Sequence, residues 1–362
     1  MKYTGTLLLI FSVLAMSCSS KKEAKHETRL NEIQFIGSHN SYKQAIDTAF
    51  FKLLLAKDSN VLGLDYHHLP LSEQLELGLR GLEIDVSHDP TGGRYQNPQG
   101  IAWAKQAGII LPPHDTAHIL SQPGMKVLHV SDIDFRSSCL TFKNCLTEIK
   151  NWSDAHPDHT PILITINTKD SGLDRPDATK VLPFTAPVLD SLDAEVLSVL
   201  PESKLITPAL VQGEAPTLRE AILKNGWPTL DAVKGRIMFI LDSPERIVNT
   251  YIANGKDRPM FVSVPETDPH AAFFILNEPV KQKEQIQALL KQNYMVRTRS
   301  DADTREARTN DYTRWQAAQA SGAQLISTDY YLGKLSPTGT FEISFDGKYS
   351  RCNPVVVGDN CK

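Results

Sequence analysis

Short apolar runs rich in β-branched residues recur along the chain, and longer stretches with a helical period of apolar positions lie between them. This alternation predicts an α/β protein with a parallel sheet, because strands buried on both faces read as continuous apolar runs. The eight main runs are residues 33–36, 82–86, 126–130, 162–166, 236–241, 273–276, 295–298 and 324–327. A ninth run, residues 260–264, precedes Pro265 and is expected to form an extra or edge strand.

Eight strand and helix repeats favour a closed TIM (β/α)8 barrel over an open sheet. Such a barrel uses about 250 residues, so a chain of 362 residues has room for additions at both ends. We expect one catalytic barrel domain over residues 32–335. Residues 336–362, which contain Pro, Gly and two cysteines, are expected to form a short C-terminal extension held by a disulfide.

The charge balance restricts the partners. The chain has 38 Lys and Arg residues against 42 Asp and Glu residues, a formal net charge of −4. Because there is no basic excess, we expect no nucleic-acid partner, and an anionic substrate must meet cations gathered locally. Neither a GxxxxGK[ST] motif nor a GxSxG motif is present, which argues against nucleotide triphosphate chemistry and an α/β-hydrolase. We expect a monomer.

The N-terminus has the features of an export signal. Lys2 precedes an apolar run, residues 7–16, that is short for a membrane span. Small residues ahead of Cys18 resemble a bacterial lipoprotein box, although Ala15 stands where Leu is usual. We therefore expect residues 1–17 to be a signal peptide and residues 18–31 to be a lipidated cysteine and tether. The protein would then be an exported lipoprotein on the membrane surface of a bacterial cell envelope (outer membrane or periplasmic side); a plain secretory signal is the alternative.

The remaining cysteines form two close pairs in sequence. Cys139 and Cys145 are one pair, and Cys352 and Cys361 are the other. In an exported chain, such spacings predict two local disulfides, with free buried thiols as the alternative. No CxxC spacing suggests zinc.

Polar side chains cluster where the predicted strands end. In a barrel of this type the functional side chains project from the carboxyl ends of the strands, so these residues are the first candidates for a site. They are Ser38, His39, Asn40, Glu83, Asp85, His129, Asp132, Asp134, Asn167, Lys169, Arg297, Arg299, Asp301, Thr328 and Asp329.

Two features of this set suggest chemistry. Glu83 and Asp85 lie two residues apart on one strand and point to the same face; with the side-chain carbonyl of Asn40 they form an all-oxygen set suited to Ca²⁺. The alternative is a carboxylate pair bonded to Arg80 or to an arginine of the seventh strand. His39 and His129 could exchange protons across the barrel mouth, although chance placement is possible among 11 histidines.

Five longer motifs carry a family resemblance. Together they resemble the calcium-dependent phosphatidylinositol-specific phospholipase C family of bacterial type, over about residues 32–331. The motifs are IGSHNSY (36–42), LRGLEIDV (79–86), KVLHVSDIDFRSSC (126–139), VRTRSDADTREAR (296–308) and SGAQLISTDYY (321–331).

The resemblance implies a role for each matching residue. It implies a TIM barrel in which His39 and His129 are catalytic. Calcium ligands are implied at Asn40, Glu83 and Asp85. A further acidic ligand, usually Glu, is expected at the position of Asn167, so the sequence departs from the family there and one negative charge is missing. The phosphate-binding residues would be Lys169, Arg297 and Arg299.

The implied activity is cleavage of phosphatidylinositol-type lipids by attack of the inositol 2-hydroxyl on phosphorus. The products would be a lipid alcohol such as diacylglycerol and a cyclic inositol phosphate. One alternative is a glycerophosphodiester phosphodiesterase-like enzyme, which usually has Arg-Gly after its first histidine, whereas Asn40-Ser41 follows here. Another is a non-catalytic surface lipoprotein that binds inositol lipids, an alternative that only Asn167 favours.

Overall fold

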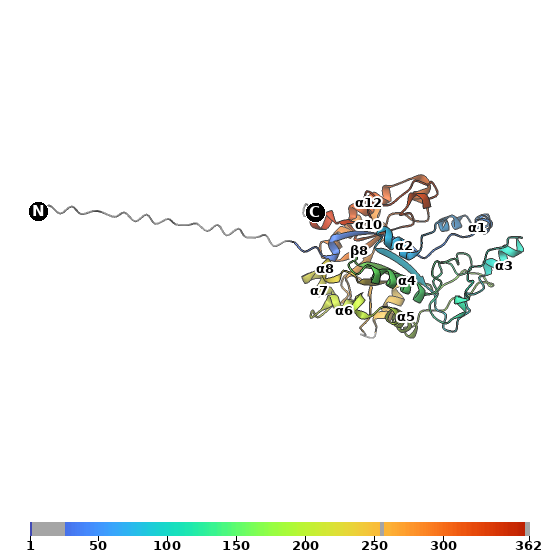
Figure 1. Cartoon of the computed structure of the whole chain (residues 1–362), viewed down its shortest axis with the longest axis horizontal. Coiled ribbons are helices and arrows are strands. Elements are labelled where there is room, and N and C mark those ends of the chain that lie inside the picture. Colours follow the sequence, from blue (N-terminus) through green and yellow to red (C-terminus); the bar gives the residue numbers. More distant parts are fainter. Residues whose placement is uncertain (2–25, 254–256, 359–362) are drawn as a thin grey trace.

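The computed structural model describes Met1, residues 26–253 and residues 257–358. Its parallel strands form a TIM-like barrel with helices packed around it (Figure 1). The strands are β1 (Ile33–Ser38), β2 (Gly81–Val86), β3 (Ile162–Thr168), β4 (Leu205–Ile206), β5 (Ile237–Asp242), β6 (Met260–Val262), β7 (Phe273–Ile275), β8 (Met295–Arg299), β9 (Leu325–Thr328) and β10 (Ser350–Cys352).

The helices mostly follow the strands in sequence, as the predicted repeat requires. The α-helices are α1 (Thr48–Leu55), α2 (Leu71–Leu77), α3 (Gln99–Gln106), α4 (Phe142–Ala155), α5 (Ala186–Val199), α6 (Pro208–Gln212), α7 (Leu218–Asn225), α8 (Leu230–Val233), α9 (Glu245–Ile252), α10 (Pro279–Leu290), α11 (Arg305–Thr309), α12 (Thr313–Ser321) and α13 (Pro354–Val357). Short 3₁₀ turns are η1 (Leu30–Glu32), η2 (Ser59–Leu64), η3 (Ile119–Ser121), η4 (Glu202–Lys204) and η5 (Gly333–Leu335).

The strand order confirms the predicted fold class. Parallel pairing runs β6, β5, β3, β2, β1, β9, β8, β7, with the short β4 beside the start of β5. Over the described residues, no backbone ladder joins β6 to β7. A side chain crosses this seam, because the backbone N–H of Ile275 donates to the Ser263 hydroxyl over 3.2 Å.

One predicted strand is wrong. Residues 126–130 form only isolated antiparallel bridges, in which Lys126 pairs with Ser87 and Thr141. Val127 and Leu128 are buried, so the apolar run reflects burial of an irregular segment, which hydrophobicity alone cannot distinguish from a buried strand. The ninth run does form an edge strand, β6, and it provides the eighth parallel strand of the barrel.

A close approach of two glycines brings the first two strands together below the site. A Cβ atom on Gly37 would lie 2.6 Å from Cα of Gly81, and one on Gly81 would lie 2.8 Å from Cα of Gly37. Any larger residue would therefore push β1 and β2 apart. This contact places the polar residues after β1 next to those of β2.

Three apolar clusters stabilise the molecule. The largest packs the barrel strands against the surrounding helices. A second includes Phe341, Ile343 and Phe345 of the C-terminal extension, whose strand β10 pairs antiparallel with β1. A third lies among α1, α3 and the loops after β2, and it includes Phe50, Leu120 and many partly exposed residues.

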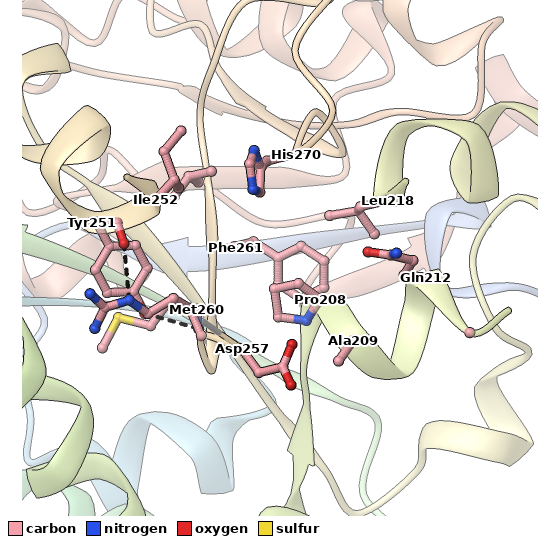
Figure 2. A pocket seen from close by; sticks show the side chains of 13 residues that line it. Pro208, Ala209, Gln212, Leu218, Tyr251, Ile252, Asp257, Met260, Phe261 and His270 are labelled. Atoms are coloured by element: carbon pink, nitrogen blue, oxygen red, sulfur yellow. Dashed lines mark hydrogen bonds between the residues drawn. The ribbon is translucent and has the colours of Figure 1, made fainter. Parts of the chain in front are cut away.

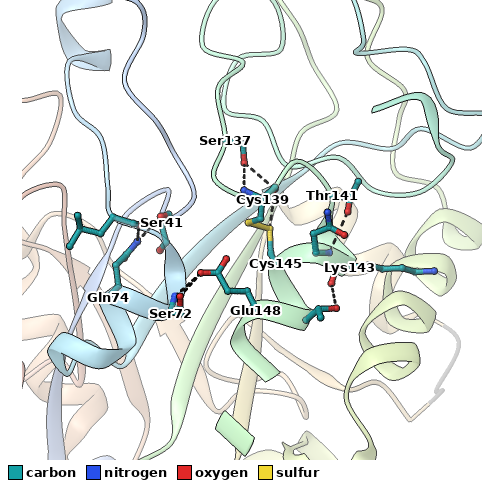
Figure 3. Close-up of a disulfide and its surroundings, with 12 residues drawn as sticks. Ser41, Ser72, Gln74, Ser137, Cys139, Thr141, Lys143, Cys145 and Glu148 are labelled. Atoms are coloured by element: carbon teal, nitrogen blue, oxygen red, sulfur yellow. Dashed lines mark hydrogen bonds between the residues drawn. A yellow bond between two sulfur atoms is a disulfide. The ribbon is translucent and has the colours of Figure 1, made fainter. Parts of the chain in front are cut away.

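The first predicted disulfide is present. Cys139 bonds to Cys145 in the first turns of α4, next to Thr141, whose hydroxyl accepts a hydrogen bond from the N–H of Asn144 at the start of that helix (Figure 3). Cys352 is also disulfide-bonded. Its predicted partner, Cys361, lies outside the described residues.

The Cys352–Cys361 bridge therefore stays a prediction. We expect non-reducing peptide mapping to recover one peptide pair for each bridge, because both spacings are short enough to close local loops. Alkylation of Cys352 or Cys361 without prior reduction would contradict the second pair. The Cys139–Cys145 pair is the internal control.

The predicted signal peptide, residues 1–17, lies outside the described residues except for Met1, and so does the predicted lipidation site, Cys18. Only residues 26–31 of the predicted tether are described, and they lead into β1. None of the described helices has the length and apolar character needed to cross a membrane.

Candidate active site

The two predicted histidines lie at the barrel mouth, and each contacts a buried carboxylate. Nδ1 of His39, just after β1, lies 2.8 Å from Oδ1 of Asp329, which follows β9. Nδ1 of His129 lies 2.8 Å from Oδ2 of Asp134. Because an ionised carboxylate only accepts hydrogen bonds, Nδ1 carries a proton in both rings, which leaves both Nε2 atoms for proton transfer.

The histidines flank one aromatic ring. The Tyr66 ring centroid lies 5.8 Å from that of His39 and 6.4 Å from that of His129. Tyr66 is buried, and burial, followed by the charge of Asp329, raises its pKa well above the usual value. The phenol therefore stays protonated, and its hydroxyl lies within hydrogen-bond distance of the Asn40 amide between the two histidines. No pattern in the sequence pointed to Tyr66 as a site residue.

The two carboxylates on β2 are buried, and each already has a cationic partner. Oε2 of Glu83 lies 2.5 Å from a guanidinium nitrogen of Arg297. Oδ2 of Asp85 accepts from Nζ of Lys169 and from the hydroxyl of Tyr42, both over 2.8 Å. The expected pairing of a carboxylate with a seventh-strand arginine is thus realised for Glu83.

Arg80 plays no part in this pairing. Its guanidinium instead donates to the backbone carbonyls of Leu75 and Leu79 and to the Thr160 hydroxyl.

Lys169 forms an ion pair with Asp85, and both burial and the neighbouring carboxylates act on its pKa. Burial opposes its charged form, but the neighbouring carboxylates outweigh burial and raise the pKa of Lys169.

Asn40 connects the carboxylates to His129. It is buried with φ of +50°, a left-handed conformation that asparagine tolerates better than most residues. Its side-chain amide has two possible orientations. In one, the amide nitrogen donates to both Asp85 oxygens, and the amide oxygen lies 3.2 Å from Nε2 of His129, which donates to it when that ring carries a second proton.

The other orientation of Asn40 tests whether these residues fit calcium. The amide oxygen then lies 3.2 and 3.3 Å from the two oxygens of Asp85, with no proton between them. Oxygens that share one Ca²⁺ at about 2.4 Å are typically separated by about 3.1–3.4 Å, so a cation would stabilise this arrangement. The oxygen donor set of Asn40, Glu83 and Asp85 therefore fits Ca²⁺.

Calcium would be held by few charged groups. Across the described ranges, no group of three or more His, Cys, Asp and Glu side chains is arranged to hold a metal ion. Two carboxylates and an amide would supply the protein ligands, with water and substrate oxygens completing the shell.

Asn167 lies on the same face of the sheet as the carboxylates. On β3 it is in register with Asp85 of β2 and with Asp242 of β5, and residues in register on neighbouring parallel strands point to the same side. It is half-buried, between the two acids. The position where the family resemblance expects an acidic ligand therefore faces the site, but with a neutral amide.

Asp242 is a site residue that the sequence reading missed, because the predicted strand ended one residue before it. One of its oxygens lies 3.6 Å from Arg297. Burial raises the pKa of Asp242 to about 6; Arg297 opposes the shift, while Glu83 and Asp85 add to it. It supplies a further negative charge next to Asn167.

Arg299 completes the cationic side of the mouth. A guanidinium nitrogen lies 3.4 Å from Nε2 of His39, and another lies 3.3 Å from Asp329. Burial, followed by the charge of Arg299, lowers the pKa of His39 well below its usual value. His39 is therefore neutral near pH 7, with its Nε2 lone pair next to a fixed positive charge.

A separate cavity of about 390 Å³ lies among α6, α7, α9 and β6 (Figure 2). Its lining mixes apolar side chains such as Phe261 with Gln212, Asp257 and His270. None of the predicted site residues line it. The polar cluster at the barrel mouth, not this cavity, therefore carries the candidate chemistry.

His68, which sequence reasoning assigned no role, supports the site from behind. Its Nε2 donates to the backbone carbonyl of His39 over 2.7 Å, and its ring stacks on Tyr331 at 5.5 Å. Within the described part of the chain, its Nδ1 has no hydrogen-bond partner. Burial lowers the pKa of His68 to about 4.

This shift predicts acid lability. Between pH 6.5 and about 4, the unfolded chain binds a proton at His68 that the folded chain does not, so the free energy of unfolding falls as the pH falls. We expect a loss of about 3 kcal/mol over this range. Urea unfolding at several pH values should show a weaker pH dependence for His68→Gln, which keeps the donor to His39 but does not titrate. Equal pH dependence of the two proteins would contradict the assignment.

Comparisons with known proteins identify the family and the fold. Residues 28–354 match the model of a family described as phosphoinositide phospholipase C, Ca²⁺-dependent. Among solved structures, the chain is similar to a calcium-dependent phosphoinositol-specific phospholipase C from Pseudomonas sp. in a myo-inositol complex, with 16% identity, TM-score 0.56, and coverage of 91% of this chain and 96% of the other.

A second similar structure is a Ca²⁺-dependent phosphatidylinositol-specific phospholipase C from Streptomyces antibioticus. It has 18% identity and TM-score 0.53, with coverage of 84% of this chain and 95% of the other. At these identities the structural likeness establishes the fold alone. A comparison with curated proteins gave no match.

Proposed function

The chain belongs to the Ca²⁺-dependent phosphoinositide phospholipase C family, a family of phosphodiesterases, and we propose that it cleaves phosphatidylinositol-type lipids to a lipid alcohol and a cyclic inositol phosphate. The observation that carries this proposal is the pair of histidines at the mouth, each with Nδ1 on a buried carboxylate and Nε2 left for the substrate. Two such groups suit a transfer that removes one proton and supplies another.

In the proposed reaction, the inositol 2-hydroxyl oxygen forms a bond to phosphorus and gives up its proton. The bond from phosphorus to the lipid oxygen breaks, and that oxygen takes a proton to become the free alcohol. One histidine stabilises the phosphorane and the other protonates the leaving alkoxide. Asp329 and Asp134 orient the rings of His39 and His129 and stabilise their protonated forms.

Calcium, held by Asn40, Glu83 and Asp85, would supply positive charge next to the non-bridging phosphate oxygens. The chain adds charge of its own. Arg299 lies against His39, where it can contact a phosphate group. Lys169 and Arg297 are engaged by Asp85 and Glu83, so their first effect is to hold these carboxylates in place.

A product assay tests the proposal. Phosphorus NMR should show a cyclic inositol phosphate when the protein, phosphatidylinositol and Ca²⁺ are combined, and no product when a chelator replaces Ca²⁺. Glycerophosphocholine is the matched control, because a glycerophosphodiester phosphodiesterase would hydrolyse it. Turnover of glycerophosphocholine alone, or binding of inositol lipid without turnover, would contradict the proposal.

We also propose that the protein is an exported lipoprotein. The sequence around Cys18 supports this, as does the Cys139–Cys145 disulfide, because such bonds persist in oxidising compartments. The chain enters the barrel at Leu30, before the start of β1, whereas the site lies where the strands end. A lipid on Cys18 would thus attach the barrel by the end that is remote from the site. Mass spectrometry of the membrane fraction would detect the acylated N-terminal peptide.

A further inference from the structure

One buried carboxylate beside the mouth contacts neither histidine. Asp301 lies two residues after the end of β8, and its side chain is fully buried. The ends of β8, β9 and β1 meet there, because these strands pair in parallel. Over the described residues, no hydrogen bond or ion pair joins Asp301 to His39, to His129 or to the residues that would hold calcium.

The partners of Asp301 lie at the end of β9. Its Oδ1 accepts from the backbone N–H of Asp329 over 2.9 Å. Its Oδ2 accepts from the hydroxyl of Thr328 over 2.5 Å, and the hydroxyl of Ser300 lies 2.7 Å from the same oxygen. Both oxygens of the carboxylate are therefore occupied, and the side chain ties the end of β9 to the end of β8.

The same two residues of β9 and its end hold His39. The carbonyl of Thr328 accepts from the backbone N–H of His39 over 2.9 Å. Oδ1 of Asp329 lies 2.8 Å from Nδ1 of the His39 ring. Asp301 is thus one residue removed from both the backbone and the ring of His39, which is the place of a group that orients a catalytic side chain.

The turn after Asp301 keeps it in this place. Asp303 and Thr304 have φ of +52° and +61°, in the left-handed region, which a β-branched residue such as threonine rarely adopts. The hydroxyl of Thr304 donates to the carbonyl of Leu62 over 3.1 Å. Because such a conformation persists only where the surrounding structure stabilises it, the turn has a fixed position against the barrel.

Asp301 also contributes to the charge around His39. Guanidinium nitrogens of Arg299 lie 3.3 Å from Oδ2 of Asp329 and 3.4 Å from Nε2 of His39. Burial opposes the charged form of Arg299, but Asp329 and Asp301 outweigh burial and raise its pKa. Two carboxylates and one guanidinium leave one negative charge in excess, which a protonated His39 would balance. Without Asp301, the charge of Arg299 would cancel that of Asp329 and disfavour a proton on His39.

We propose that Asp301 is a positioning residue for His39: its carboxylate fixes the end of β9 against the histidine and supplies negative charge that stabilises the protonated ring during turnover. The proposal rests on the proposed function, because a histidine that takes up or releases a proton passes through its charged form in either role.

The titration of Asp301 gives the proposal a pH dependence that can be measured. Burial, followed by the charge of Asp329, raises the pKa of Asp301 to about 6, while Arg299 and two hydroxyl groups oppose the shift. Tyr330 is also close, but burial raises its pKa, so the phenol stays neutral. Asp301 is therefore mostly ionised at pH 7.5 and mostly protonated at pH 5, where it has lost the charge that acts on His39.

The test compares two variants of Asp301. Asp301→Asn keeps the size of the side chain and an oxygen for the N–H of Asp329 but removes the charge, whereas Asp301→Ala removes both. Asp193→Asn is the matched control, because Asp193 is also buried and accepts hydrogen bonds from Tyr251 and Arg258, away from the mouth. The values of kcat and KM are measured on phosphatidylinositol with saturating Ca²⁺ between pH 7.5 and 5. Thermal unfolding identifies a variant that has lost its fold.

At pH 7.5 we expect kcat to fall about tenfold in Asp301→Asn and about 10²-fold in Asp301→Ala, with KM within about threefold of that of the unchanged protein, because Asp301 does not touch the substrate. At pH 5 the unchanged protein has mostly lost this charge as well, so its kcat should be within about twofold of that of Asp301→Asn. Other groups that titrate in this range, such as Asp242, act on both proteins and cancel in the ratio. Asp193→Asn should match the unchanged protein at every pH.

NMR of isotope-labelled histidine rings gives a second measurement that needs neither substrate nor Ca²⁺. The His39 signal is assigned by its loss in His39→Ala. We expect the tautomer with the proton on Nδ1 in the unchanged protein at pH 7.5, and a mixture of both tautomers in Asp301→Asn, because Arg299 then draws Asp329 away from the ring. Lowering the pH to 5 should move the signal of the unchanged protein in the same direction.

Several results would overturn the proposal. These are an unchanged kcat of Asp301→Asn at pH 7.5, a ratio of rates that stays constant down to pH 5, and equal losses in Asp193→Asn. A rise in KM alone would do so too, because it would place Asp301 against the substrate. An unchanged His39 signal in Asp301→Asn would overturn it without reference to activity. If the unchanged protein turned over no inositol lipid, the proposed function would fail, and the NMR comparison would still decide whether Asp301 acts on His39.

Discussion

Replacing either His39 or His129 by alanine is expected to lower turnover of phosphatidylinositol by about 10²–10⁴-fold, the usual contribution of a positioned acid or base. Each ring is oriented by the contact of its Nδ1 with a buried carboxylate over 2.8 Å, which positions its Nε2 for proton transfer. Initial rates on phosphatidylinositol with saturating Ca²⁺ measure the effect.

The fold of these variants should be intact, since both rings are partly exposed at the mouth and support no apolar core. His270→Ala is the matched control, because His270 is exposed and lines the separate cavity. Turnover close to that of the unchanged protein in either active-site variant would remove that histidine from the mechanism. Circular dichroism and thermal unfolding would identify a variant that has lost activity by unfolding.

Replacing Asn167 by glutamate is expected to strengthen calcium binding by about tenfold or more, because the affinity of such sites follows the charge of their ligands. Asn167 is in register with Asp85 and Asp242, so a carboxylate there would face the proposed metal. It would also offset the positive charge of Lys169, which lies 2.8 Å from Asp85. Calorimetric titration with Ca²⁺ measures the change without depending on activity.

Asn167→Gln is the matched control, because it has the size of glutamate without the charge. We expect Asn167→Glu to bind Ca²⁺ more tightly than the unchanged protein, and Asn167→Gln to bind it no more tightly. If Asn167→Glu bound Ca²⁺ equally or less tightly, Asn167 would not face the metal, and the assignment of the neighbouring ligands would need revision. If Asn167→Gln strengthened calcium binding as much as Asn167→Glu, the length of the side chain and not its charge would explain the change.

Much of the site was accessible from the sequence, because the carboxyl ends of barrel strands meet at one end of the molecule. This rule placed His39, Asn40, Glu83 and Asp85 at one mouth, where the structure brings them together. It also selected Asp134 and Asp329 as candidates. Their contacts with the histidines could not be predicted, since His39 and Asp329 are 290 residues apart and their pairing depends on how the barrel closes.

The pairing of cations with carboxylates inside the mouth could likewise not be predicted from the sequence. Lys169 and Arg297 were expected to bind phosphate, but the fold sets them on Asp85 and Glu83. Which cation pairs with which buried carboxylate depends on strand register and side-chain reach, and the Glu83–Arg297 contact spans 214 residues. Asp242 was missed because the apolar run that predicted its strand stops at residue 241.

By itself, the sequence determined the α/β class and the strand ends that bear polar groups, because apolar periodicity and spacing record which positions are buried. It did not determine hydrogen-bonding partners. Residues 126–130 therefore read as a strand although they form none. Burial leaves a local pattern in the chain, whereas pairing and exposure are settled only when distant segments pack against each other.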